Sequence, residues 1–201
     1  MAKLMQPHSF LRNAEGALVN YSYTDVADGT GVIVFYGATA HTSAGATQML
    51  TTQQVYSKYI VLDAGTYNFD LTPFNSPRVM KGTAYLNVGH WTQSAGSNSI
   101  VKVKIQKSSG GSVTDCSSQI SSDTLDGNGA HIVHHIPIAL TTTNFKKGDF
   151  LRCEIVVNSD LNPIEIGVDP VGRDGTNLNA ALTNPACTTK FKLYIPFRID
   201  I

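Results

Sequence analysis

The last twelve residues of the chain, from Lys190 to Ile201, constrain the fold more than any other segment. They read KFKLYIPFRIDI, with an apolar residue at every odd position and a charged, polar or turn-type residue at every even position. A period of two over this length predicts a β-strand with one buried and one solvent-exposed face, because a helix would scatter the apolar groups around its circumference. We therefore expect the end of the chain to lie in a sheet of an all-β protein.

Other segments show similar strand patterns between turn signals. They are 31–38, 59–62, 66–71, 79–91, 99–107, 114–120, 130–140, 149–158 and 163–168. The segments 59–62 and 66–71 flank Asp63-Ala64-Gly65 and are expected to pair as a hairpin. Residues 40–52 and 169–187 are interpreted as polar loops. These strands, without an amphipathic helix, predict an antiparallel β-sandwich of jelly-roll type as one domain over 21–201.

The first twenty residues have weak periodicity and are interpreted as an N-terminal arm or loop, residues 1–20. Such an arm is either a frayed terminus or a strap onto a neighbouring subunit, and the sequence favours neither. Within the strands, alternation predicts which side chains point inward. The expected inward set is Met80, Ala84, Leu86, Val88, Val101, Val103, Ile105, Ile132, His134, Ile136, Ile138, Leu151, Cys153, Ile155 and Val157. Gly82 and Gly89 are expected at bulges or close approaches.

Charge and composition exclude several classes of function. The 201 residues hold 15 basic and 15 acidic side chains, so nothing in the net charge attracts nucleic acid or an anionic membrane. Charged residues make up only 15% of the chain, and Thr, Ser and Asn must supply the polar surface, which suits contact with other proteins. No apolar run approaches the ~20 residues of a membrane span, and MAKLMQPHSF lacks a signal-peptide core, so we expect synthesis in the cytoplasm.

Three cysteines, Cys116, Cys153 and Cys187, are an odd number without CxxC spacing. This pattern argues against a disulfide framework or a zinc knuckle and predicts free thiols. Cys153 lies on an apolar strand face and is expected to be a small core residue.

The histidines of segment 130–140 are candidate metal ligands. His131 and His135 share a strand face but lie about 13 Å apart, too far to hold one ion, and His134 points to the opposite face. We expect ordinary strand histidines and no single-chain zinc site. A site built from one histidine of each of three subunits on a symmetry axis stays open.

Two loops carry acidic and amide side chains that could serve as calcium ligands. They are Asp123, Asp126 and Asn128 in the first loop, and Asp169, Asp174 and Asn177 in the second. Neither loop has the EF-hand spacing or its terminal Glu, and Asp-Gly and Asn-Gly pairs are common in turns. We therefore predict no metal and no cofactor.

Signatures of catalysis are missing from the sequence. It contains no GxSxG, no Cys-His context and no phosphate-binding glycine motif. Its only glutamates are Glu15, Glu154 and Glu165, so a catalytic carboxylate pair would need aspartates from distant loops. Lys102, Lys104 and Lys107 form a basic stripe without aromatic residues, which is typical of a solvated strand face. We therefore expect no enzyme and no catalytic residues.

Several segments together resemble virion proteins of tailed bacteriophages. These are YTDVADGTGVIVFYGA (23–38), YNFDLTPFNSPRVMKGTAYLNV (67–88) and KLYIPFRIDI (192–201). The segment LTTTNFKKGDFLRCEIVV (140–157) is similar to the Lys-Gly-Asp and apolar-strand segment of complement- and tumour-necrosis-factor-like jelly rolls. The resemblance covers about half the chain, rests on structural motifs and transfers no binding residue.

The resemblance implies a head decoration or cement protein that binds the major capsid protein on the outer capsid surface of the virion. Its expected partners are that capsid protein and itself, as a homotrimer. The alternative is a receptor-binding module of a head or tail fibre that binds host glycan. Trp91, His90 and the loops 40–52 and 169–187 would then form the sugar site.

Overall fold

The structure, a computed structural model, describes residues 30–42, 45–55, 61–62, 64–92, 98–126, 131–159, 164–168 and 190–198. They contain thirteen strands and no helix, hence no helix long and apolar enough to cross a membrane. The strands are β1 (Thr30–Thr42), β2 (Gly45–Thr51), β3 (Val61–Leu62), β4 (Gly65–Leu71), β5 (Arg78–Thr92), β6 (Asn98–Ser109), β7 (Ser112–Asp115), β8 (Ile120–Ser121), β9 (Leu125–Asp126), β10 (His131–Phe145), β11 (Phe150–Ser159), β12 (Ile164–Gly167) and β13 (Phe191–Arg198).

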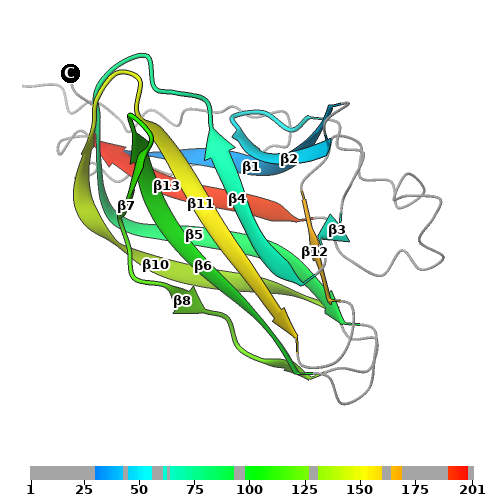
Figure 1. The fold of residues 1–201 in the computed structure, drawn as a ribbon. Helices are drawn as coiled ribbons and strands as arrows, with labels where there is room; N and C mark the ends of the chain where they lie inside the picture. The colour runs from blue at the N-terminus through cyan, green and yellow to red at the C-terminus, as the bar shows by residue number, and fades with distance from the viewer. Residues whose placement is uncertain are drawn as a thin grey trace, which may run out of the picture.

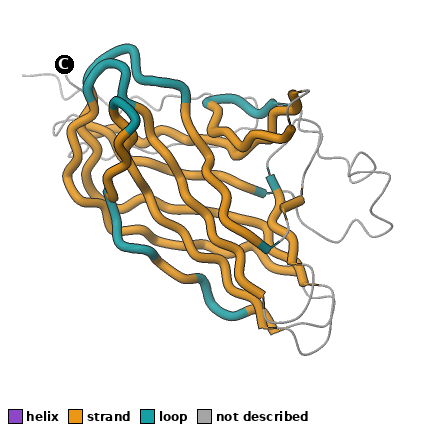
Figure 2. The backbone as a smooth tube through the Cα atoms, viewed as in Figure 1, coloured by secondary structure: helices purple, strands orange, loops and turns teal. Residues whose placement is uncertain are grey.

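The strands form two packed layers (Figures 1 and 2). One layer has the order β10-β5-β13-β1, and the other has the order β4-β11-β6-β7 with β8 and β9 also on β6. All of these pairings are antiparallel; β2 pairs antiparallel with β1 and parallel with β4, which joins the layers along one side. Two packed layers of antiparallel strands, between which the chain crosses from β4 to β5, from β5 to β6 and from β10 to β11, are typical of a jelly-roll sandwich. The predicted all-β sandwich of jelly-roll type is confirmed.

Two predicted details of the connections are wrong. The polar segment 40–52 is not a loop, because residues 40–42 end β1 and residues 45–51 form the whole of β2, in a hairpin rich in Thr and Ala. The expected pairing of 59–62 with 66–71 does not form: β3 pairs with β12, while β4 pairs with β11 and β2. The strands before and after the turn residues 63–65 therefore pair with different strands instead of with each other. The predicted arm over 1–20 lies outside the described residues.

The C-terminal strand lies in the middle of its layer, as its sequence pattern predicts. β13 pairs with β1 on one side and with β5 on the other, and its odd residues are buried from Phe191 to Phe197. The β13–β5 register shifts between Tyr194 and Phe197, so Pro196, which has no amide proton to donate, falls at the break in the ladder. Gly82 lies beside Pro196 with φ of +111°, which confirms the expected irregularity.

The core lies between the two layers and is rich in phenylalanine. The rings of Phe69 on β4 and Phe191 on β13 are 4.5 Å apart across the sandwich, and Phe74 contacts Phe145 and Phe197 edge to face. The inward residues expected from alternation are buried, with one exception: Ile132 is 43% exposed. Cys153 is fully buried, as predicted, and burial raises the pKa of its thiol.

A glycine gives Phe191 its space. A Cβ atom at Gly37 of β1 would overlap the ring carbons of Phe191, whose side chain is fully buried. Interiors are packed too densely to absorb such an overlap without strain. Gly37 is therefore required by packing rather than by its backbone conformation.

We predict that Gly37→Ala destabilises the fold by about 1–3 kcal/mol, the usual cost of an overpacked core. The measurement is urea denaturation. In the double variant Gly37→Ala/Phe191→Leu the added methyl group meets a smaller side chain. The double variant should therefore lose less unfolding free energy than the sum of the losses in the two single variants. Strict additivity would show that the glycine has another role.

The turn before β11 is built around Asp149. Its carboxylate accepts hydrogen bonds from the Lys146 amide at 2.8 Å and contacts the Lys107 ammonium at 2.9 Å. Bonds from the Ser109 hydroxyl, the Lys146 amide and Lys107 hold the pKa of Asp149 well below its usual range. Gly148 adopts φ of +91°, and its amide donates to the Phe74 carbonyl at 2.9 Å. The turn thus ties the β10–β11 connection to the segment after β4.

Asp149→Asn should lower stability at neutral pH because the amide cannot pair with Lys107. A depressed carboxyl pKa contributes stability above the unfolded value of 3.8, and that contribution is lost as the pH falls below it. Thermal melting from pH 6 to about 2.5 should therefore show a shallower acid loss in Asp149→Asn than in the wild type. Parallel acid profiles for the two proteins would contradict this account.

Candidate functional site

A pocket of about 380 Å³ lies between two sheet edges. Among the described strands, β10 pairs with β5 alone and β8 with β6 alone, so each is an edge of a different layer. The Thr141 amide joins the edges by donating to the Cys116 carbonyl at 2.8 Å, whereas the segments 120–123 and 132–137 flank the pocket. The strands β8 and β10 that flank the pocket lie on the side of the sandwich opposite the β2–β4 junction (Figure 1).

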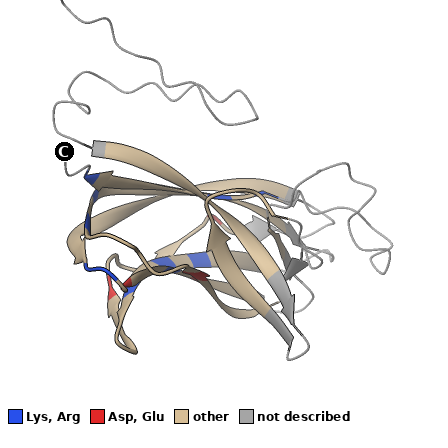
Figure 3. Cartoon of the chain, turned by 90° about the horizontal axis from the view of Figure 1, so that it is seen from above, with Lys and Arg blue, Asp and Glu red and all other residues tan. Residues whose placement is uncertain are grey.

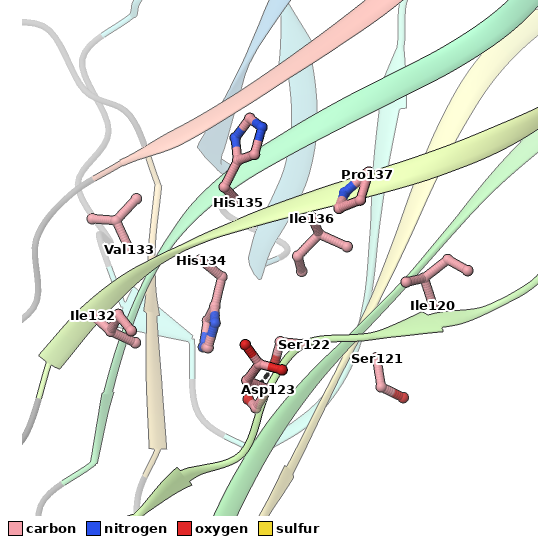
Figure 4. Close-up of a pocket in the computed structure, with 10 residues that line it drawn as sticks. All are labelled: Ile120, Ser121, Ser122, Asp123, Ile132, Val133, His134, His135, Ile136 and Pro137. Atoms are coloured by element: carbon pink, nitrogen blue, oxygen red, sulfur yellow. Dashed lines mark hydrogen bonds between the residues drawn. The ribbon is translucent and has the colours of Figure 1, made fainter.

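A chain of buried polar side chains starts at this pocket. His134 of β10 points into the pocket, where Asp123 lies across from it (Figure 4). Its Nε2 is 2.8 Å from Nδ1 of His90 on β5, and Nε2 of His90 is 2.9 Å from the Ser99 hydroxyl on β6. His90 and Ser99 have no exposed surface and His134 is 6% exposed. The chain therefore crosses the core from one layer to the other.

Strand geometry explains the contact between the two histidines. Ile132 pairs with His90, and His134 pairs with Val88, so the two imidazoles are diagonal neighbours on the inner face of adjacent strands. Diagonal side chains of this kind are within reach of each other when they are long. The rings lie 5.0 Å apart.

Burial keeps both imidazoles neutral near pH 7. Desolvation, followed by repulsion from His134, lowers the pKa of His90 to about 4. Desolvation also lowers the pKa of His134, while the nearby Asp123 carboxylate acts in the opposite direction. A neutral imidazole has one donor and one acceptor nitrogen, so each histidine can serve both of its neighbours in the chain without carrying a charge.

This hydrogen-bonded series has the hydroxyl-to-imidazole contact of a nucleophile and its base, but a substrate cannot reach the hydroxyl. Ser99 is fully buried beneath His90, so no substrate reaches its hydroxyl in this conformation. The groups instead satisfy one another in the core, where an unpaired polar group would cost free energy. The sequence pattern missed this network because the register that brings His90 to His134 is not encoded by alternation.

The other histidines lie elsewhere. His135 points to the outer face, opposite to His134 as predicted, where its ring stacks on Tyr85 at 5.2 Å and its Nδ1 bonds to Asn87 Oδ1. His131 occupies the start of β10, and its side chain is outside the described residues. No group of three or more His, Cys, Asp or Glu side chains that could hold a metal occurs within the described ranges.

Of the acidic-loop candidates, the structure describes the side chain of Asp123 alone. Asp123 lies at the pocket, and Asp126 ends β9 with its side chain undescribed. Asn128, Asp169, Asp174 and Asn177 lie outside the described residues.

The sugar site expected under the fibre alternative is not assembled as predicted. His90 is in the core and cannot contact a glycan, and the segment 40–52 belongs to strands. Trp91 lies near the end of β5 with its side chain undescribed, and the loop 169–187 is outside the described residues.

The two outer faces of the sandwich differ in chemistry. On the β4-β11-β6 layer, Lys104 contacts Asp115 and Glu154 at 3.3 and 3.5 Å, and Arg152 contacts Asp70 at 2.6 Å. Basic and acidic segments accordingly lie side by side on this sheet (Figure 3). These charges neutralise one another, so this face attracts partners of neither sign, as expected for a solvated face.

The outer face of the β10-β5-β13-β1 layer carries aromatic, apolar and basic side chains. We call it the tyrosine face, and its register aligns two rows across four strands. They are Val34, Tyr194, Tyr85 and Pro137, and then Tyr36, Lys192, Asn87 and His135. Tyr85 is 40% exposed, and the Lys192 ammonium lies 5.4 Å from the Tyr36 ring. The described residues of this face include no carboxylate.

Comparison with known proteins identifies the fold but no family. No protein-family model matches the sequence, and no curated protein matches it. An aminopeptidase from a marine sediment archaeon, Thaumarchaeota archaeon, matches 92% of this chain with a TM-score of 0.56 at 9% identity, and a CocE/NonD family hydrolase from Staphylococcus aureus matches 84% with the same TM-score at 10% identity. The chain spans 39% and 37% of those proteins. At such identity the likeness shows the fold alone.

We predict a loss of stability between pH 6.5 and about 4 that depends on His90. In this window the unfolded state binds a proton that native His90 does not, so the native state loses about 3 kcal/mol as the pH falls. Chemical denaturation across this range should give a shallower profile for His90→Gln. His135→Gln, which alters an exposed imidazole, should retain the wild-type profile. An unchanged slope in His90→Gln would contradict the assignment.

Proposed function

We propose that this chain is a structural protein of a tailed-phage virion that decorates the outer capsid surface through its tyrosine face. The proposal combines the sequence resemblance with one structural observation, the contrast between the two outer faces. The self-paired charges of one sheet favour water, while the aligned aromatic residues of the other favour burial against protein.

Exposed tyrosines suit such a contact. A tyrosine ring supplies apolar area and its hydroxyl a hydrogen bond, which is why tyrosine is common among residues that dominate interface energy. Tyr85 and Tyr194 lie at the middle of the four-stranded row, and hydrogen bonding to strands on both sides fixes their backbones. A rigid surface loses little entropy on docking.

The role is mechanical, so it needs no catalytic group. Under this proposal the protein is not an enzyme, and it is synthesised in the host cytoplasm before it joins the virion. The partners are the major capsid protein and further copies of this chain in a homotrimer. The hydrolase names among the structural matches belong to proteins of which this chain covers less than two fifths.

The test is co-sedimentation of the purified protein with capsids that lack it. We expect saturable binding by the wild type and an affinity about tenfold lower or worse for Tyr85→Ser, since loss of a central tyrosine often costs more than 1 kcal/mol. The matched control is Val113→Ser on β7, because Val113 is 45% exposed but lies on the other layer. Wild-type protein that stays in the supernatant, or equal binding by Tyr85→Ser, would contradict the proposal.

A further inference from the structure

The pocket between β8 and β10 borders the tyrosine face, with which it shares His135 and Pro137, but its chemistry is different. Ten residues line it, and Asp123 is the one charged group among them. The apolar part of its wall includes Ile120, Ile132 and Ile136, and Ser121 and Ser122 add hydroxyls. One carboxylate above an apolar wall fits a side chain that has an aliphatic stem and a cationic head.

His134 adds a polar atom directed into this space. His134 is only 6% exposed, and its ring points toward Asp123 (Figure 4). Nε2 is occupied by His90, so Nδ1 is the nitrogen left to serve a molecule in the pocket. In the neutral form with a proton on Nε2, Nδ1 accepts a hydrogen bond from a cationic donor.

The edge beside the pocket can receive a strand. β10 pairs with β5 alone among the described strands, and Pro137 lies within it. A proline is tolerated in a strand where its nitrogen faces away from the ladder, and none of the described strands pairs with 132–137 on the side of β10 away from β5. Ile132 and Val133 on this edge are 43% and 37% exposed. Unpaired strand edges bind extended segments by main-chain hydrogen bonds, while adjacent pockets read the side chains.

We propose that the β8–β10 pocket binds the arginine or lysine side chain of an extended partner segment that adds to the free edge of β10. Asp123 pairs with the cation, His134 accepts a hydrogen bond from it, and the isoleucines cover its aliphatic stem. Charge complementarity identifies the occupant, because the single charge of the pocket is negative. This site does not depend on the tyrosine face or on the proposed place in a virion.

The test uses a blocked peptide, acetyl-Thr-Val-Arg-Val-Thr-amide, added to the ¹⁵N-labelled full chain and followed by NMR. We expect saturable shifts in the amides of 121–123 and 132–136, with a dissociation constant of about 1 mM for so short a probe. The same peptide with citrulline in place of arginine has the shape without the charge and should bind about tenfold more weakly.

Two variants test whether Asp123 is the carboxylate that binds the arginine of the peptide. Asp123 is exposed, so Asp123→Asn should fold normally and should weaken the arginine peptide about tenfold while leaving the citrulline peptide unchanged. Asp115→Asn on β7 removes another exposed carboxylate that does not line the pocket and should bind like the wild type. Absent saturation, shifts confined to other strands, or equal binding of the arginine peptide to wild type and Asp123→Asn would overturn the proposal.

Discussion

The whole sandwich depends on how β13 places Phe191 between the layers. The ring fills the space that Gly37 leaves on one strand and packs on Phe69 of the opposite layer. Because β13 also supplies hydrogen bonds to β1 and β5, the last element of the chain connects strands from its beginning and its middle. Such long-range pairing means that the first layer is complete only when nearly the entire chain is present.

The sequence predicted where most strands lie and which of their side chains point inward, because burial of one sheet face requires an apolar residue at every second position. The alternation in 99–107 and 149–158 predicted the buried apolar residues of β6 and β11, but it did not predict that Ser99 and Gln106 of β6 are also buried. Residues 40–52 were misjudged because small polar residues weaken the same signal in the β1–β2 hairpin. The turn at 63–65 misled for a different reason, since a turn signal says nothing about which strand will be the next partner.

The site was harder to predict than the fold because its residues come from three strands. Alternation correctly predicted that His134 points inward. The same alternation of buried residues in β5, at Ala84, Leu86 and Val88, continues to His90. It could not show that the two imidazoles meet, since that contact depends on the β5–β10 register, nor that Ser99 of the other layer completes the chain. Ile132 has an inward pattern but borders the pocket, which explains its exposure.

The β2–β4 junction is the one parallel pairing among the described strands, and it gives the sandwich two unlike sides. On this side, main-chain hydrogen bonds of β2 to β1 and to β4 join the two layers. The opposite margin is held by the Thr141 amide and by side chains, above all the imidazole pair and its serine. The two sides therefore differ in how the layers are joined: a strand pairing on one side, and isolated hydrogen bonds on the other.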